Sequence, residues 1–171
     1  MDITDVILHQ HGEQRRMFAM LDEIRHTDTE TLAAVWKRLE ILLETHAEAE
    51  ERFFYPRLLK IGKGAADADD AAEEVEDAIK DHNEIREAIR DVAKHHAGSD
   101  AWWKAVIDCR IANSDHMAEE ERQDLADFRT QTDLRTRHEI AIDFLRFESQ
   151  RAASGVEPKD KEPEQYVADN S

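Results

Sequence analysis

The chain is poor in the residues that typify β-proteins, disulfide-rich secreted proteins and nucleic-acid binders. Its 171 residues include five glycines, three prolines and one cysteine, and 40 acidic against 23 basic side chains give a net charge of −17. So few glycines and prolines disfavour a turn-rich all-β fold, and the single cysteine, Cys109, excludes a disulfide framework. The negative charge argues against nucleic acid or an anionic membrane surface as partner.

Long apolar runs are also missing, so we expect no membrane-spanning segment. The N-terminal residues MDITDVILHQ have neither the basic start nor the uninterrupted apolar stretch of a secretion signal. A cytoplasmic protein in a reducing compartment is therefore expected. The length suffices for one compact domain with a sizeable core.

Apolar residues recur every three or four positions in five segments, which predicts an all-α protein. Four long helices are expected at about residues 4–25, 29–55, 69–96 and 100–129, with Pro56 disturbing or ending the second. They should form an up-down-up-down four-helix bundle. A fifth helix at about 132–150 should pack outside the bundle or on another subunit, which leaves an oligomer open. Residues 1–150 then form the domain, and the polar residues 151–171 are expected to be a disordered tail.

Each long helix offers one histidine on its inward face. The intervals between these four histidines are 35, 36 and 34 residues, and the midpoints fall on the predicted turns. Residues equidistant from a turn lie at one height in an antiparallel bundle, so the four imidazoles should meet in one layer. The four residues are His11, His46, His82 and His116.

Two of these histidines carry a glutamate four residues later on the same helix face: His46 with Glu50, and His116 with Glu120. A single inward histidine is more often an ordinary core residue. Burying four imidazoles and two carboxylates without compensation, however, would cost several kcal/mol per ion, and cations between them would remove that cost. Imidazole with carboxylate suits iron, manganese or zinc, and two shared glutamates favour a dinuclear centre with iron as first choice.

Four segments carry a family resemblance: LHQHGEQRRMF, LLETHAEAEERFFYP, KDHNEIREAI and SDHMAEEERQDL, one around each histidine. Over about residues 5–128 the chain resembles the hemerythrin-like (HHE cation-binding) family of four-helix bundles. The resemblance implies a non-haem, oxo- or hydroxo-bridged diiron site that meets O2, hydrogen peroxide or nitric oxide, or that senses iron.

One position departs from the oxygen-carrying members, which have a further histidine four residues after the one in the third helix. Here that position is Arg86. With two histidines each, both irons would keep an open or exchangeable position, which suits peroxide better than reversible O2 carriage. We therefore expect catalase-like disproportionation of hydrogen peroxide, with O2 or nitric oxide binding, or iron or redox sensing, as alternatives.

Two further residues near the site have open interpretations. Tyr55 is an additional candidate ligand if Pro56 forces it out of the helical conformation and turns its phenol inward, and a core or capping role is the alternative. Gly12 either permits a close backbone approach beside His11 or is a tolerated surface glycine.

Access to the site is expected from one side only. An apolar layer closes the side toward the first turn, so substrate should enter from the opposite end, near Tyr55. That layer consists of Phe18, Leu39, Ile89 and Cys109.

Overall fold

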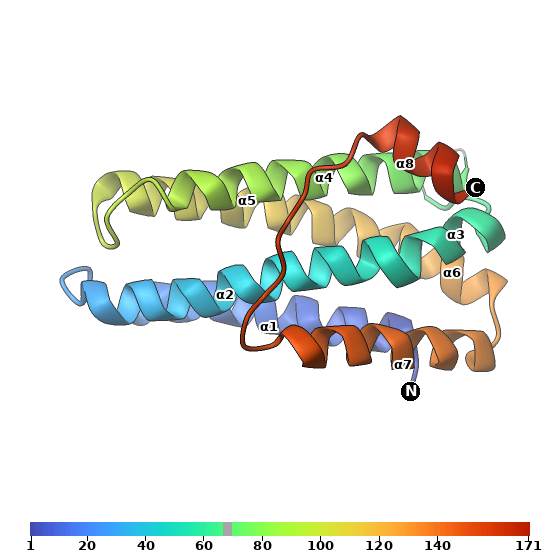
Figure 1. Ribbon diagram of the computed structural model, residues 1–171, viewed down its shortest axis with the longest axis horizontal. Helices are drawn as coiled ribbons and strands as arrows, with labels where there is room; N and C mark the ends of the chain where they lie inside the picture. The colour runs from blue at the N-terminus through green and yellow to red at the C-terminus, as the bar shows by residue number, and fades with distance from the viewer. Residues whose placement is uncertain (67–69) are drawn as a thin grey trace.

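The computed structural model describes residues 1–66 and 70–171, and this part of the chain folds into helices without strands. Four long antiparallel helices form a bundle in which each packs on two others (Figure 1). The predicted all-α four-helix bundle is confirmed. None of the described helices is long and apolar enough to cross a membrane. The four helices are α1 (Ile3–Glu23), α2 (Thr29–Ala49), α4 (Ala71–Val92) and α5 (Asp100–Arg122).

Two of these helices continue into shorter ones at one end of the bundle. A π-helical turn, η1 (Glu50–Phe54), leads from α2 into α3 (Tyr55–Ile61), and α5 passes into α6 (Asp124–Gln131). The prediction of one helix over 100–129 is wrong at Gln123, where φ is −106° and ψ is −78°. The helix changes direction at this break, and Leu125 and Phe128 of α6 are buried at the end of the core.

The third long helix is shorter than expected. Asp69, its predicted start, lies outside the described residues, and α4 ends at Val92 rather than near residue 96. The chain then turns through Gly98, which has a φ of +81°, into α5, whose N-cap Ser99 accepts a hydrogen bond from the Trp102 amide. Glycine suits this turn because other residues rarely adopt positive φ.

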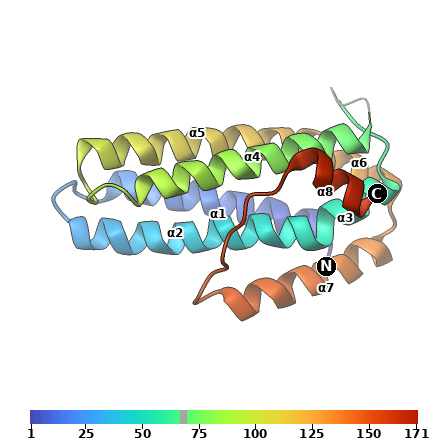
Figure 2. The same cartoon turned by 45° about the horizontal axis from the view of Figure 1, so that its top comes forward.

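The fifth predicted helix is α7 (Leu134–Arg151). Its inner face, including Phe144 and Phe147, is buried against α1, α2 and η1, so it covers the side of its own bundle (Figure 2). The prediction of a disordered tail after residue 150 is wrong. Residues 152–171, called here the C-terminal strap, cross the bundle and end in α8 (Pro163–Asn170), which packs on α4 and α3.

The apolar core is divided in two. One cluster fills the half near the α1–α2 and α4–α5 turns, and its members include the predicted closing layer of Phe18, Leu39, Ile89 and Cys109. The other fills the half covered by η1, α3, α6 and α7. Buried polar side chains from all four long helices lie between the two clusters.

Two carboxylates hold the segment that follows α3. Asp127 Oδ2 accepts hydrogen bonds from the amides of Lys63 and Gly64 at 2.5 and 3.0 Å, and Glu74 Oε1 accepts one from the amide of Ala65 at 2.8 Å. Burial, with a further contribution from the charge of Asp127, raises the pKa of Glu74 to about 7.

Replacement of Glu74 by Gln should change how stability depends on pH. Between about pH 4.5 and pH 7 the folded chain binds more protons at Glu74 than the unfolded chain does, so the free energy of unfolding falls as pH rises. Glu74→Gln should remove this contribution to the decrease in the free energy of unfolding. The variant should therefore be more stable than wild type at pH 8 but not at pH 4. Urea unfolding from pH 4 to 8 measures this, with the exposed Glu76→Gln as control, and parallel curves for Glu74→Gln and wild type would contradict it.

Two glycine substitutions should shift stability in opposite directions. A Cβ on Gly98 would lie 2.4 Å from the backbone oxygen of His26 at a positive φ, so Gly98→Ala should cost at least about 1 kcal/mol. Gly12 is exposed in α1, and a Cβ there meets no described atom within 4 Å outside its own helix, so the surface interpretation of Gly12 holds. Gly12→Ala should stabilise by about 1 kcal/mol. Thermal melts of both variants check the signs.

Candidate metal centre

The four predicted histidines meet between the two apolar clusters. Each comes from a different long helix, and each is at most 4% exposed. The ring centroids of His11 and His46 are 5.2 Å apart, and those of His82 and His116 are 4.6 Å apart. The layer of imidazoles predicted from the spacing is therefore present.

Both predicted glutamates point into the same layer and are buried. Glu50, the first residue of η1, places Oε1 2.9 Å from His46 Nε2 and Oε2 3.4 Å from His82 Nε2. Glu120, on α5, places Oε2 3.1 Å from His11 Nε2. The two carboxylates thus face the inner nitrogens of the histidines.

These side chains form two groups that share one carboxylate. His11, His46, Glu50 and Glu120 make the first group, and Glu50, His82 and His116 make the second, with the offered atoms of each group within 4.8 Å of one another. Glu50 therefore faces both groups. Glu120 belongs to the first group only, which differs from the expected pair of equivalent bridges.

The inner atoms are those of a cation site. His11 Nε2, His46 Nε2, both oxygens of Glu50 and Glu120 Oε2 are buried without a hydrogen bond to any described residue. Such atoms normally find a partner, because an unsatisfied buried polar group costs about 1–3 kcal/mol. A cation held among them would satisfy all of them, so the residues present fit a metal ion.

Electrostatics at the centre favours an ionised Glu50. Burial would raise the pKa of Glu50, but its close contacts with His46 and His82 outweigh burial and hold that pKa well below its usual range. Burial would lower the pKa of His11, but its close contacts with the carboxylates of Glu120 and Glu121 outweigh burial and raise that pKa to about 9. In the metal-free chain a protonated His11 thus balances part of the buried negative charge.

Each imidazole directs its outer nitrogen, Nδ1, to an oxygen away from the centre. Ionised carboxylates and amide oxygens can only accept, so Nδ1 carries the proton in these pairs. In the neutral imidazole the Nε2 lone pair then points inward, as in metal-binding histidines. The four outer pairs are His11 with Glu121 at 2.9 Å, His46 with Gln10 at 2.6 Å, His82 with Glu51 at 2.8 Å and His116 with Asp81 at 3.5 Å.

The amide at Gln10 is oriented by a neighbour on α7. Gln10 Nε2 donates to Glu148 Oε2 at 2.5 Å, which leaves Gln10 Oε1 facing His46 Nδ1. The side of α7 that covers the bundle therefore fixes the orientation of one inner histidine.

The spacing of the histidines did not point to any of the four outer partners, although the sequence carries their signal. Glu51 and Glu121 directly follow the two inner glutamates, and each serves the histidine of another helix. Gln10 and Asp81 directly precede His11 and His82. The sequence thus holds a tandem repeat of a lone histidine followed about 35 residues later by His-x-x-x-Glu, given once by His11, His46 and Glu50 and again by His82, His116 and Glu120. This repeat extends to the outer partners, as the pair Glu-Glu in both halves shows.

Tyr55 lies at the centre, for a reason other than the predicted one. Its side chain is fully buried and its hydroxyl donates to Glu120 Oε1 at 3.1 Å. The backbone at Tyr55 is helical, with φ −60° and ψ −38°, so Pro56 does not displace it. Instead the Tyr55 amide bonds to the carbonyl of Glu50, five residues earlier, and this π-turn returns Tyr55 to the face of Glu50.

Arg86, at the position of the missing histidine, serves a different purpose. Its side chain is 1% exposed, and Nη2 donates to Glu51 Oε1 at 2.6 Å. The same oxygen accepts the bond from His82 Nδ1. Arg86 therefore supports the site through Glu51 and is not one of the groups that face the centre.

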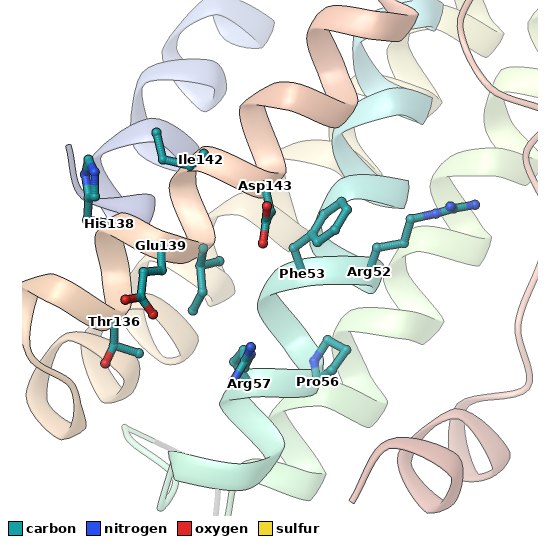
Figure 3. Close-up of a pocket in the computed structure, with 10 residues that line it drawn as sticks. Arg52, Phe53, Pro56, Arg57, Thr136, His138, Glu139, Ile142 and Asp143 are labelled. Atoms are coloured by element: carbon teal, nitrogen blue, oxygen red, sulfur yellow. The ribbon is translucent and has the colours of Figure 1, made fainter.

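A pocket of about 490 Å³ opens between α7 and the junction of η1 with α3 (Figure 3). Phe53 and Pro56, which lie near Tyr55 in the chain, line this pocket. The four histidines, Glu50 and Glu120, called here the six inner side chains, do not line it. It lies on the side from which substrate entry is expected, but it does not reach the centre, so that route stays a prediction.

Comparison with known proteins identifies the family. Residues 2–127 match the family described as the Hemerythrin HHE cation binding domain. No curated protein and no solved structure matches the chain. The match spans the whole bundle and all six inner side chains. The chain therefore belongs to the hemerythrin HHE cation-binding family.

Proposed function

We propose that this chain holds two iron ions and decomposes hydrogen peroxide in a catalase-like reaction. The ligands would be His11, His46, Glu50 and Glu120 at one position and Glu50, His82 and His116 at the other. The observation that carries the proposal is that Glu50 belongs to both groups, with one oxygen toward His46 and the other toward His82. A carboxylate shared in this way is the arrangement that bridges two metal ions in helical bundles.

The donor set suits iron, manganese or zinc, since imidazole nitrogens and carboxylate oxygens bind all three, and we take iron as the first choice. The absence of thiolates or thioethers among the inner groups makes copper(I) a poor fit. A pair of iron ions can give up two electrons and take them back at a single site.

Peroxide is favoured over reversible O2 carriage by the ligand count. Each position has two histidines, because Arg86 stands where a further histidine would be and contacts Glu51 instead. Neither position is saturated, so both can exchange a small molecule. In disproportionation, two molecules of hydrogen peroxide give one O2 and two waters, and two electrons pass from one peroxide to the other.

The chain encloses the site between apolar residues and places one protonated hydroxyl, that of Tyr55, next to it. Apolar residues lie on both sides of the polar layer and limit water. The Tyr55 hydroxyl holds a proton against Glu120, and burial raises the pKa of that phenol well above its usual range. Tyr55 can therefore orient Glu120 while staying protonated at neutral pH.

Iron loading of wild type and of His82→Ala tests the proposal. We expect wild type to bind two iron ions per chain, to release O2 from hydrogen peroxide and to melt at higher temperature when loaded. A metal at 100 times its dissociation constant stabilises a fold by about 2.7 kcal/mol. His82→Ala should lose about one iron, most of the O2 release and part of the thermal shift. Elemental analysis, an oxygen electrode and thermal melts make the measurements.

The exposed His96→Ala is the matched control and should behave as wild type. Wild type that binds iron but releases no O2 would reject the peroxide reaction. Reversible spectral change with O2 or nitric oxide would then favour the binding alternative, and metal-dependent stability with partner binding would favour sensing. Wild type without bound metal after loading would reject the centre itself.

Tyr55→Phe separates the two roles open to this phenol. If Tyr55 acts only as a hydrogen-bond donor to Glu120, Tyr55→Phe should still bind two irons. Its metal affinity should fall about 10-fold or more, as for other groups that orient ligands. Visible absorption spectra of the ferric proteins provide the check. An intense band present in wild type and lost in Tyr55→Phe would instead identify a tyrosine ligand.

A further inference from the structure

The C-terminal strap lies beyond the matched family domain and reaches the surroundings of the metal centre. It leaves the end of α7, passes Ile41 of α2 at Gly155 and crosses to α4, where α8 lies along the bundle (Figures 1 and 2). Tyr166 of α8 is only 9% exposed and joins the core cluster that contains Tyr55. The strap is thus packed into the fold.

Two residues of α4 fix the position of the strap beside the centre. Arg90 holds Asp160 through two bonds of 3.1 and 3.0 Å. Asn83 contacts the backbone of Lys161 twice, since its Nδ2 donates to the Lys161 carbonyl at 2.7 Å and its Oδ1 accepts from the Lys161 amide at 3.1 Å. Asn83 immediately follows His82 in the chain, so the backbone at Lys161 is anchored next to an inner histidine.

The anchored lysine completes a buried cluster around Glu51. Glu51 is 3% exposed, and its Oε1 accepts from His82 Nδ1 at 2.8 Å and from Arg86 Nη2 at 2.6 Å. Its other oxygen, Oε2, pairs with Lys161 Nζ, which also contacts Glu48 Oε2 at 3.0 Å. A buried carboxylate is costly unless it is paired, and the strap supplies the second cation.

The strap also holds the backbone of Glu51. In the π-turn the Tyr55 amide bonds to the Glu50 carbonyl, and the next bond of that kind would run from residue 56 to the Glu51 carbonyl. Residue 56 is proline and has no N–H to donate. The hydroxyl of Tyr166 donates to the Glu51 carbonyl instead. Glu51 is therefore fixed by the strap at both its backbone and its side chain.

The equivalent carboxylate of the other half does not depend on the strap. Glu121, which accepts from His11 Nδ1, is paired with Arg15 of α1 at 2.8 Å, and both of these side chains are partly exposed. The two halves of the repeat thus differ in what orients the inner histidine.

We propose that Lys161 and Tyr166 are positioning residues for the metal position formed by His82 and His116. By fixing Glu51 they hold His82 with its Nδ1 proton outward and its Nε2 toward the centre. The inference rests on the proposed two-metal function. It predicts a selective effect. Loss of the strap contacts lowers the metal affinity of the position formed by His82 and His116 and leaves that of the position formed by His11 and His46 nearly unchanged.

Cobalt(II) binding to the metal-free, full-length chain tests this, because cobalt absorption reports its ligands without any peroxide turnover. Titration against a competing chelator should give two binding events in wild type. Lys161→Met should weaken one event by about 10- to 100-fold and the other by less than about 3-fold. Lys161→Arg keeps the charge and should restore the weakened event to within about 3-fold. Lys159→Met, an exposed lysine two residues away, is the control and should match wild type.

Tyr166→Phe provides a second variant should Lys161→Met fold poorly, and it should weaken the same binding event. Thermal melts of the metal-free variants separate a general loss of stability from the selective effect. Wild type with two events and Lys161→Met indistinguishable from Lys159→Met would overturn the role of the strap alone, as would equal weakening of both events. Wild type that binds no cobalt would instead remove the proposed metal function and the inference with it.

Discussion

Burial of carboxylates and imidazoles in one layer is the constraint on which the structure depends. Glu50 and Glu120 lie in the middle of a bundle whose two halves are otherwise apolar. An ionised group in such a place is tolerated only when it is paired. The four long helices must therefore place their histidines at the same height in the bundle. The spacing of about 35 residues between successive histidines follows from that requirement.

The same requirement explains why the repeat extends beyond the inner groups. An imidazole that is to face the centre with Nε2 needs an acceptor at Nδ1, or its ring can turn. Glu51 and Glu121 meet this need across helices, since each follows an inner glutamate on one helix and serves a histidine on another. The outer residues thereby connect neighbouring helices as well as orienting the rings.

Periodicity predicted the bundle and all six inner side chains, because helix faces and turn positions are local properties of a sequence. It did not predict the π-turn at Glu50, since one extra residue in a turn is stabilised by tertiary contacts such as the Tyr55 bond to Glu120. The strap was missed for a related reason. Its composition is that of a disordered segment, and it is ordered by individual contacts of Lys161 and Tyr166 with a distant helix.

These tertiary contacts act unequally on the two halves of an otherwise repeated site. Tyr55 donates to one oxygen of Glu120, and that carboxylate belongs to a single group, whereas Glu50 faces both groups. Glu51 is buried between two cations, whereas Glu121 is partly exposed beside one. A duplicated pattern of histidine and glutamate therefore gives two groups of side chains with different surroundings. The two groups are chemically distinct, since one brings four inner side chains together and the other three.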